Sequence, residues 1–257
     1  MSKTRMNSGD SEQLRSVDAA LLAMQSAGVP LPAGGSVRLS AAVSRRDAVV
    51  LRDIVRDVRP RASMEVGLGY GVSAMFIIDG LRQVGGVRHH VIDPYQGRDW
   101  WSGGLFTLQR LGLQPWFCLY EQSTSEAVSD MVARGVRVQF AFIDGSHSFQ
   151  NVLLDIVAVD RVLDDGGVVV LDDCDFHSVL MAVRFLERNG PYVPVSSGMG
   201  WKTRTRFRER WTDGLQSLGR SLRKGRWPSR TTIGAPSLRV FRKESGSWRN
   251  SMTFRRF

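Results

Sequence analysis

The stretch MEVGLGYGV, residues 64–72, joins a short apolar segment to an apolar helix through three alternating glycines. Gly67, Gly69 and Gly71 allow the backbone to turn sharply and to approach a ligand, because glycine tolerates positive φ angles. The helix expected to begin near Val72 would present free N–H groups at the same turn. The GxGxG spacing differs from the GxGxxG spacing of dinucleotide-binding turns. The turn is therefore either a ligand-binding loop or a plain strand–helix connection.

Strands and helices alternate on the C-terminal side of this turn. The expected strands cover residues 64–66, 90–93, 116–120, 138–143, 167–171, 192–195 and 238–242. The central ones are apolar at successive positions, as in parallel strands that are buried on both faces. This pattern predicts an α/β fold: a Rossmann-like, doubly wound, mostly parallel seven-stranded sheet with helices on both faces.

The pattern divides the chain into four parts. Residues 1–40 form a polar N-terminal extension with one short helix over 16–26, and residues 41–200 form the core. Residues 201–236 read as a basic insert or lid, and residues 237–257 as the last strand with a basic C-terminal tail.

Composition excludes several classes of protein. The chain has 257 residues, of which 42% are hydrophobic and 23% charged, as in ordinary globular proteins. Cys118 and Cys174 belong to no CxxC motif, so neither a disulfide framework nor structural zinc is expected. No segment has the ~18–20 apolar residues that a membrane span needs. Residues 1–15 lack an apolar signal core, so we expect a cytoplasmic protein.

Positive charge is concentrated near the C-terminus. The net charge is +10, and residues 201–257 hold 16 of the 35 Lys and Arg residues but 3 of the 25 Asp and Glu residues. Arg204, Arg206, Arg208 and Arg210 occupy every second position, with Trp201, Phe207 and Trp211 nearby, a mixture suited to phosphate contact and base stacking. Residues 201–230 could thus contact nucleic acid or an anionic surface at the inner membrane face, or form a solvated flap.

Polar residues lie at or just after the C-terminal ends of the first three expected strands. Glu65 lies two residues before the first glycine, which suggests a ligand with a cationic group. Asp93 ends the second strand, where a carboxylate suits ribose hydroxyls. Gln122 and Ser123 follow the third strand and either contact a purine or cap the next helix.

Three carboxylates follow two later strands. Asp144 directly follows the expected strand 138–143, and Asp172 and Asp173 directly follow the expected strand 167–171. Neighbouring parallel strands would bring all three to one rim, where their charges repel unless a cation neutralises them. Mg²⁺ prefers such oxygen ligands, so a magnesium site is predicted here. Alternatively, one carboxylate caps a helix and another faces solvent.

Histidines divide into two groups. His147 lies three residues after Asp144 and is the candidate general base, while His177 is a weaker second candidate. His89 and His90 begin a strand away from the expected site, and we expect them to be structural.

Taken together, these motifs resemble those of class I S-adenosylmethionine-dependent methyltransferases. Residues 65–71 resemble the family's first motif, and Asp93 its ribose-binding acid. The segments FIDGSH (142–147) and LDDGGVVVLDD (163–173) are similar to the branch that contains macrolide-sugar and rhamnosyl O-methyltransferases. Asp165 stands where that family usually has proline.

The resemblance implies specific roles. The glycine turn would hold the methionine part of S-adenosyl-L-methionine, with Glu65 near its amine and Gln122, Ser123 and Asp144 also at the cofactor. Mg²⁺ would be held by Asp144, Asp172 and Asp173, and His147 would take the proton of an acceptor hydroxyl. The acceptor would be a small molecule or a glycoside, bound by variable segments over 95–104 and 196–236, and a homo-oligomer is compatible with the sequence.

Three alternatives remain from the sequence. An NAD-dependent oxidoreductase shares the fold, but the glycine spacing and the late acidic pair argue against it. A nucleic-acid methyltransferase or an RNA-binding protein would use the basic C-terminal segment. A pseudo-enzyme would keep the sheet without an acceptor site, against which the retained Asp144 and His147 argue.

Overall fold

The computed structural model describes residues 16–195, 237–250 and 252–257. The predicted insert 201–236, with its proposed contacts to nucleic acid or membrane, lies outside the described residues. Within the described residues, no helix combines the length and the apolar character needed to cross a lipid bilayer.

One seven-stranded sheet organises the chain, in the order β5-β4-β3-β6-β7-β9-β8. Its strands are β3 (Ala62–Val66), β4 (Arg88–Ile92), β5 (Phe117–Tyr120), β6 (Val138–Ile143), β7 (Leu163–Leu171), β8 (Tyr192–Pro194) and β9 (Arg239–Lys243). The pairs from β5 to β7 are parallel, and β9 runs antiparallel to both β7 and β8. The predicted doubly wound, mostly parallel fold is confirmed.

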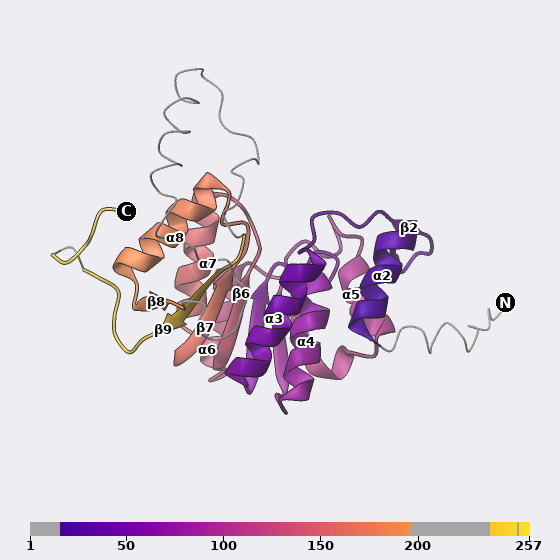
Figure 1. The fold of residues 1–257 in the computed structure, drawn as a ribbon, viewed down its shortest axis with the longest axis horizontal. Coiled ribbons are helices and arrows are strands. Elements are labelled where there is room, and N and C mark those ends of the chain that lie inside the picture. Colours follow the sequence, from indigo (N-terminus) through magenta and orange to yellow (C-terminus); the bar gives the residue numbers. More distant parts are fainter. Residues whose placement is uncertain (1–15, 196–236, 251) are drawn as a thin grey trace, which may run out of the picture.

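Helices cover both faces of the sheet, and each face has its own apolar core (Figure 1). One core includes residues of α2 (Val17–Ala27), α3 (Arg45–Val58), α4 (Val72–Gln83) and α5 (Gly103–Arg110). The other includes residues of α6 (Thr124–Ala133), α7 (Phe149–Asp160) and α8 (His177–Asn189). The apolar residues of β6 serve both cores, since Phe140 and Phe142 face the first and Ala141 and Ile143 the second.

The N-terminal part of the described chain packs onto this sheet. Leu21 and Met24 of α2 are buried in the first core, and Asp18 forms ion pairs with Arg45 and Arg52 of α3. A two-stranded antiparallel ribbon of β1 (Val29–Pro30) and β2 (Ser36–Val37) lies between α2 and α3. The boundary predicted at residue 40 stays a prediction.

Strand order determines where ligand-binding side chains can gather. β3 lies between β4 and β6, and β7 follows β6, so the ends of four parallel strands form one edge. Ligands of open α/β sheets bind beyond the carboxyl ends of the strands. We therefore expect a ligand-binding site among the turns that follow β3, β4, β6 and β7.

Candidate functional site

The glycine turn after β3 has the conformation that its sequence predicts. Gly67, Gly69 and Gly71 have φ angles of +93°, +51° and +82°. A Cβ atom on Gly67 would lie 2.2 Å from the backbone oxygen of Asp144 at the end of β6. Gly71 is the N-cap of α4, and no side chain caps the helix there. The turn thus brings bare backbone against the end of the neighbouring strand.

Asp93 holds this turn in place from the end of β4. Its Oδ2 accepts hydrogen bonds from the backbone N–H groups of Leu68 (3.0 Å) and Gly69 (3.1 Å). Its Oδ1 accepts one bond, from Tyr95 N at 2.8 Å, and retains capacity for a ligand hydroxyl. The observed role of Asp93 is thus to brace the turn, while ribose binding stays a prediction.

Gln96 is a functional candidate that the sequence did not reveal. It is fully buried, and its Nε2 donates to Asp93 Oδ2 at 2.8 Å and to the backbone oxygen of Gly69 at 2.9 Å. No periodic pattern marks this residue, because it lies in a loop whose path the strand–helix alternation does not determine. The only local feature that indicates the contact is the short spacing of three residues between Asp93 and Gln96.

Glu65 is buried directly before the turn. Its side chain has 0% exposure, and neither carboxylate oxygen has a hydrogen-bond partner within the described part of the chain. A buried carboxyl group without a donor is costly, at about 1–3 kcal/mol or more. Such a group is satisfied when a ligand supplies the donor.

Gln122 and Ser123 lie at the exposed end of β5. Ser123 caps α6 in a capping box: its Oγ accepts from Glu126 N at 3.4 Å, and Glu126 Oε2 accepts from Ser123 N at 3.1 Å. Gln122 Nε2 lies 3.4 Å from Asp130 Oδ2. Ser123 therefore caps a helix, which was one of the two alternatives for it. A purine contact by Gln122 or Ser123 remains a prediction.

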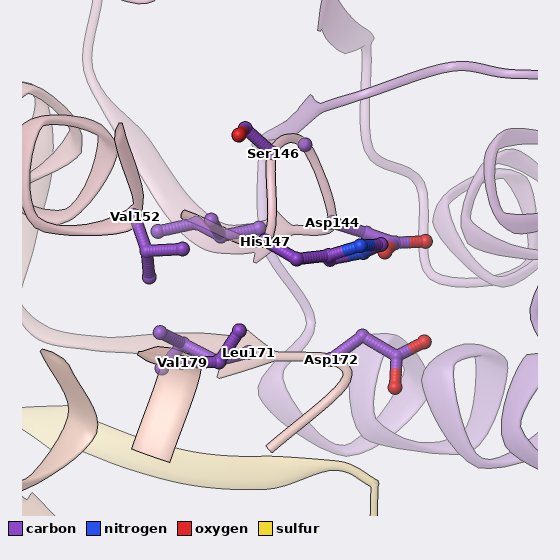
Figure 2. Close-up of a pocket in the computed structure, with 9 residues that line it drawn as sticks. Asp144, Ser146, His147, Val152, Leu171, Asp172 and Val179 are labelled. Atoms are coloured by element: carbon purple, nitrogen blue, oxygen red, sulfur yellow. The ribbon is translucent and has the colours of Figure 1, made fainter. Parts of the chain in front are cut away.

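The ends of β6 and β7 bring the predicted acidic residues to one edge. Ile143 pairs with Leu171 in the parallel ladder, so Asp144 and Asp172, the residues that follow them, leave the sheet side by side. Figure 2 shows their carboxylates extending in the same direction, with the His147 ring next to Asp144. Asp173 has a φ angle of +51°, in the left-handed region that non-glycine residues seldom adopt.

Burial, together with the crowding of negative charge, raises the pKa of two of these groups. Burial raises the pKa of Asp144 well above its ordinary value, and the nearby carboxylates of Asp172, Asp173 and Glu65 raise it further. Burial also raises the pKa of Asp172 to about 6, with contributions from Asp173 and from Asp47 of α3. Asp47 comes from a helix before the glycine turn, so strand-end reasoning did not identify it.

The potential metal ligands differ from the predicted set by one residue. One atom each from Asp144, His147 and Asp173 lie within 4.8 Å of one another, and Asp172 adjoins this group without belonging to it. Two carboxylates and an imidazole are a donor set that can hold a divalent cation. The residues present therefore fit a metal ion.

His147 is oriented by two neighbours. Its Nε2 lies 2.7 Å from Asp173 Oδ2, and its ring stacks on Phe176 with a centroid distance of 5.0 Å and an interplanar angle of 7°. The imidazole is 47% exposed, so a substrate can reach it. A histidine held by a carboxylate in this way can accept a proton, since the carboxylate stabilises the imidazolium that results.

Aromatic residues border the same turn. Trp100 packs edge-on against Tyr70 at 5.0 Å, and its ring approaches the position that a Cβ on Gly69 would take, at 3.9 Å. Trp101 is 55% exposed and has a φ angle of +48°. Trp100 is thus a packing residue, whereas Trp101 stays available at the surface.

The sequence of the central region matches a known family. Residues 64–174 match the family model described as a methyltransferase domain. These residues form a methyltransferase domain. The domain runs from β3 to the turn after β7, and it contains the glycine turn, Asp93, Asp144 and the Asp172–Asp173 pair.

Solved structures with the same fold include several methyltransferases. The O-methyltransferase from Bacillus cereus in complex with SAH shares 14% identity with this chain, covering 89% of it and 90% of the bacterial chain, with a TM-score of 0.53. TomG, an O-methyltransferase from Streptomyces achromogenes involved in tomaymycin synthesis, in complex with SAM, shares 16% identity over 95% and 100% of the two chains (TM-score 0.53). A cofactor-bound protein from MTB shares 21% identity over 70% and 80% (TM-score 0.51).

No protein of curated function matches the sequence significantly. The structural similarities establish the fold, and the family model establishes the methyltransferase domain. The predicted class I methyltransferase is thereby confirmed. The narrower resemblance to the macrolide-sugar and rhamnosyl branch stays a prediction.

Proposed function

We propose that this protein transfers a methyl group from S-adenosyl-L-methionine to a hydroxyl group of a small-molecule or glycosyl acceptor. The single observation that carries the proposal is the buried Glu65 carboxyl, which lacks a hydrogen-bond donor within the described residues and lies beside the positive-φ glycine turn. That pairing fits a ligand with an ammonium group and a polar backbone-binding portion, as S-adenosylmethionine has.

The protein's own groups would bind and orient the cofactor. When bound, S-adenosylmethionine supplies a methyl group already activated by its sulfonium. Glu65 would accept hydrogen bonds from the cofactor amine, and Asp93 Oδ1 would accept one from a ribose hydroxyl. The bare backbone of residues 67–71 would allow the methionine portion to approach closely. Alignment of the acceptor oxygen with the methyl carbon and sulfur is then the main catalytic requirement.

The acidic edge would activate the acceptor. His147 would take the proton of the hydroxyl, and Asp173, 2.7 Å from its Nε2, would hold the ring and stabilise its positive charge. Asp144 and Asp173, with Asp172 adjoining, would hold Mg²⁺, which would stabilise negative charge on the acceptor oxygen. The structural similarity to O-methyltransferases supports a hydroxyl acceptor without identifying it.

A methyl-transfer screen tests this function. The full chain is incubated with S-adenosylmethionine labelled in its methyl group, with and without Mg²⁺, against glycosides, catechols and RNA. We expect label in a glycoside or catechol that is lost when EDTA is present and restored by excess Mg²⁺. Label in RNA alone would favour the nucleic-acid alternative, and full activity in chelator would contradict the metal assignment.

A further inference from the structure

Three polar side chains lie buried beneath the glycine turn on one face of the sheet. Ser63 and Glu65 are on β3, and His89 is on the neighbouring strand β4, paired with Ser63 in the parallel ladder. All three have 0% exposure. In β6, the residues that pair with Ser63 and Glu65 are Phe140 and Phe142, which belong to the apolar core under α3 and α4. The polar group is thus embedded in an apolar layer.

The three side chains form a chain of contacts that ends at Glu65. Ser63 Oγ and His89 Nδ1 are 2.9 Å apart, a hydrogen bond. On the other side of the ring, His89 Nε2 lies 3.5 Å from Glu65 Oε1, which is too long for a good hydrogen bond. His89 Nε2 and both Glu65 oxygens lack hydrogen-bond partners within the described residues. The hydrogen bond between Ser63 and His89 is therefore formed, whereas the one between His89 and Glu65 is not.

The direction of the Ser63 bond determines what His89 offers to Glu65. In a neutral imidazole one ring nitrogen carries the proton and the other accepts. If the Ser63 hydroxyl donates to Nδ1, the proton is on Nε2 and faces the Glu65 carboxylate. The opposite arrangement would place the Nε2 lone pair of a neutral ring against that carboxylate, which is unfavourable. The contacts thus favour a donor pointing at Glu65.

We propose that His89 is a positioning residue, which, held by Ser63, orients the Glu65 carboxylate for the α-amine of the cofactor. The inference rests on the proposed function, because the amine is that of S-adenosylmethionine. It also revises the expectation that His89 is merely structural. On binding, the ammonium group would supply donors to one side of the carboxylate while Nε2–H of His89 supports the other.

The test compares two ligands that differ by one group. Calorimetry measures the affinity of the full chain for S-adenosylhomocysteine and for its analogue without the α-amine, in wild type, His89→Leu and His89→Gln. Leucine removes the donor, while glutamine can present an amide N–H close to the position of Nε2. We expect His89→Leu to weaken S-adenosylhomocysteine binding about ten-fold and binding of the deaminated analogue less than about two-fold. His89→Gln should recover most of the loss.

The ligand comparison separates positioning from folding. A general structural defect would weaken both ligands equally, and that result would overturn the proposal, as would unchanged binding of both. Ser63→Ala provides a second variant, which should weaken only the amine-bearing ligand, by about three-fold, because the ring loses the bond that orients it. Equal effects on both ligands in Ser63→Ala would also overturn it.

Failure of the proposed function gives a different result. If the wild-type chain binds neither ligand, the proposed function fails and the role of His89 fails with it. If the wild type binds S-adenosylhomocysteine more tightly than the deaminated analogue and His89→Leu keeps the same preference, the function stands and only the role of His89 is wrong.

Discussion

The carboxylates of this site differ in what holds them. Asp93 accepts four hydrogen bonds, from three backbone N–H groups and the Gln96 amide, and it serves the fold of the turn. Glu65 accepts none within the described residues. Asp144 and Asp172 are crowded by other carboxylates. At the scale of single residues, Glu65, which lacks a donor, and the crowded Asp144 and Asp172 are the groups that a cofactor or cation would stabilise.

His147 is the residue whose replacement tests the proton-transfer step. His147→Ala should lower turnover by about 10²–10⁴-fold, the usual contribution of a general base, with cofactor affinity unchanged. Turnover is measured with the acceptor found in the screen, and cofactor affinity by calorimetry. His177→Ala is the comparison, since His177, an exposed histidine at the start of α8, is the second candidate for the base. Comparable activity in the two variants would mean that another group takes the proton.

Gly67 tests the contact between the turn and β6. Gly67→Ala should lower the free energy of unfolding by about 3 kcal/mol or more, because the added Cβ meets backbone at 2.2 Å and the residue has a φ of +93°. Gly135→Ala is the control: its φ is +69°, but no atom lies within 4 Å of the added Cβ. We expect about 1–2 kcal/mol for this control, from the backbone conformation alone. Urea unfolding that gives equal losses would contradict the close approach.

The raised pKa of Asp172 implies that metal binding depends on pH. Its pKa in the folded protein is about 6, above the ordinary value of 3.8, so between these values the folded state keeps a proton that the unfolded state releases. This contribution to stability is therefore lost as pH rises from about 4 to about 6. Above pH 6 the Asp172 carboxylate is charged, and its negative charge beside the Asp144–His147–Asp173 group favours the binding of Mg²⁺.

Thermal unfolding with and without Mg²⁺ checks this dependence. Millimolar Mg²⁺ should raise the melting temperature by about 2–6 °C at pH 7.5 and by less than about 1 °C at pH 5. Burial also raises the pKa of Asp155 to about 6, but Asp155 is not one of the carboxylates proposed to hold or adjoin the cation, so comparing plus and minus Mg²⁺ at each pH removes its effect. An equal shift at both pH values, or none at either, would exclude a carboxylate cation site.

At the scale of elements, β9 is fastened to the end of α7 by a buried cation. Lys243 Nζ donates to the backbone oxygens of Asp160 (2.7 Å) and Leu163 (3.0 Å), and it lies 3.1 Å from Asp160 Oδ1. Asp160 Oδ1 also accepts from the Tyr192 hydroxyl at 2.7 Å, which ties in β8. The antiparallel end of the sheet thus depends on one small polar network.

Removal of that cation should weaken the sheet edge. Lys243→Met should lower the free energy of unfolding by about 2–3 kcal/mol, because two buried carbonyls and the Asp160 carboxylate lose a charged donor. Arg242→Met, on the adjacent exposed position of β9, should change stability by less than about 0.5 kcal/mol. Urea unfolding compares the two variants, and similar losses in both would show that the network contributes little.

The elements show why the sequence predicts the sheet well and some boundaries less well. β6 has the predicted bounds, Val138–Ile143, because its residues are almost all apolar and its ends are clear. β7 begins at Leu163 rather than at 167, since Asp164–Gly167 reads as a turn but continues the strand with an irregularity in its register with β6. α7 begins at Phe149, with Ser148 as its N-cap.

The site was less predictable than the sheet for a physical reason. Periodicity identifies strand ends, and so Glu65, Asp93, Asp144 and Asp172 could be placed on one edge. Periodicity does not determine the paths of loops, so the sequence does not predict the hydrogen bonds of Gln96 to Asp93 and Gly69. Pairings between separate loops, such as His147 with Asp173 at 2.7 Å, also depend on side-chain directions that a linear pattern does not contain.

At the scale of the whole molecule, one strand order brings these parts together. β3 lies next to both β4 and β6, so the glycine turn, the Asp93 brace and the Asp144 edge meet although they are far apart in sequence. The methyltransferase domain over residues 64–174 contains all of them, while α2 and α3 precede it and β8 and β9 complete the sheet behind it. The proposed methyl transfer therefore depends on a cofactor that binds where these segments meet.

Calorimetric titration of the full chain with S-adenosylhomocysteine tests that dependence most directly, in wild type and in Glu65→Gln. We predict micromolar binding to the wild type and a loss of at least about ten-fold in the variant, because the amide loses the charge that pairs with the ligand amine. No binding to the wild-type chain, or equal binding to both, would contradict the account.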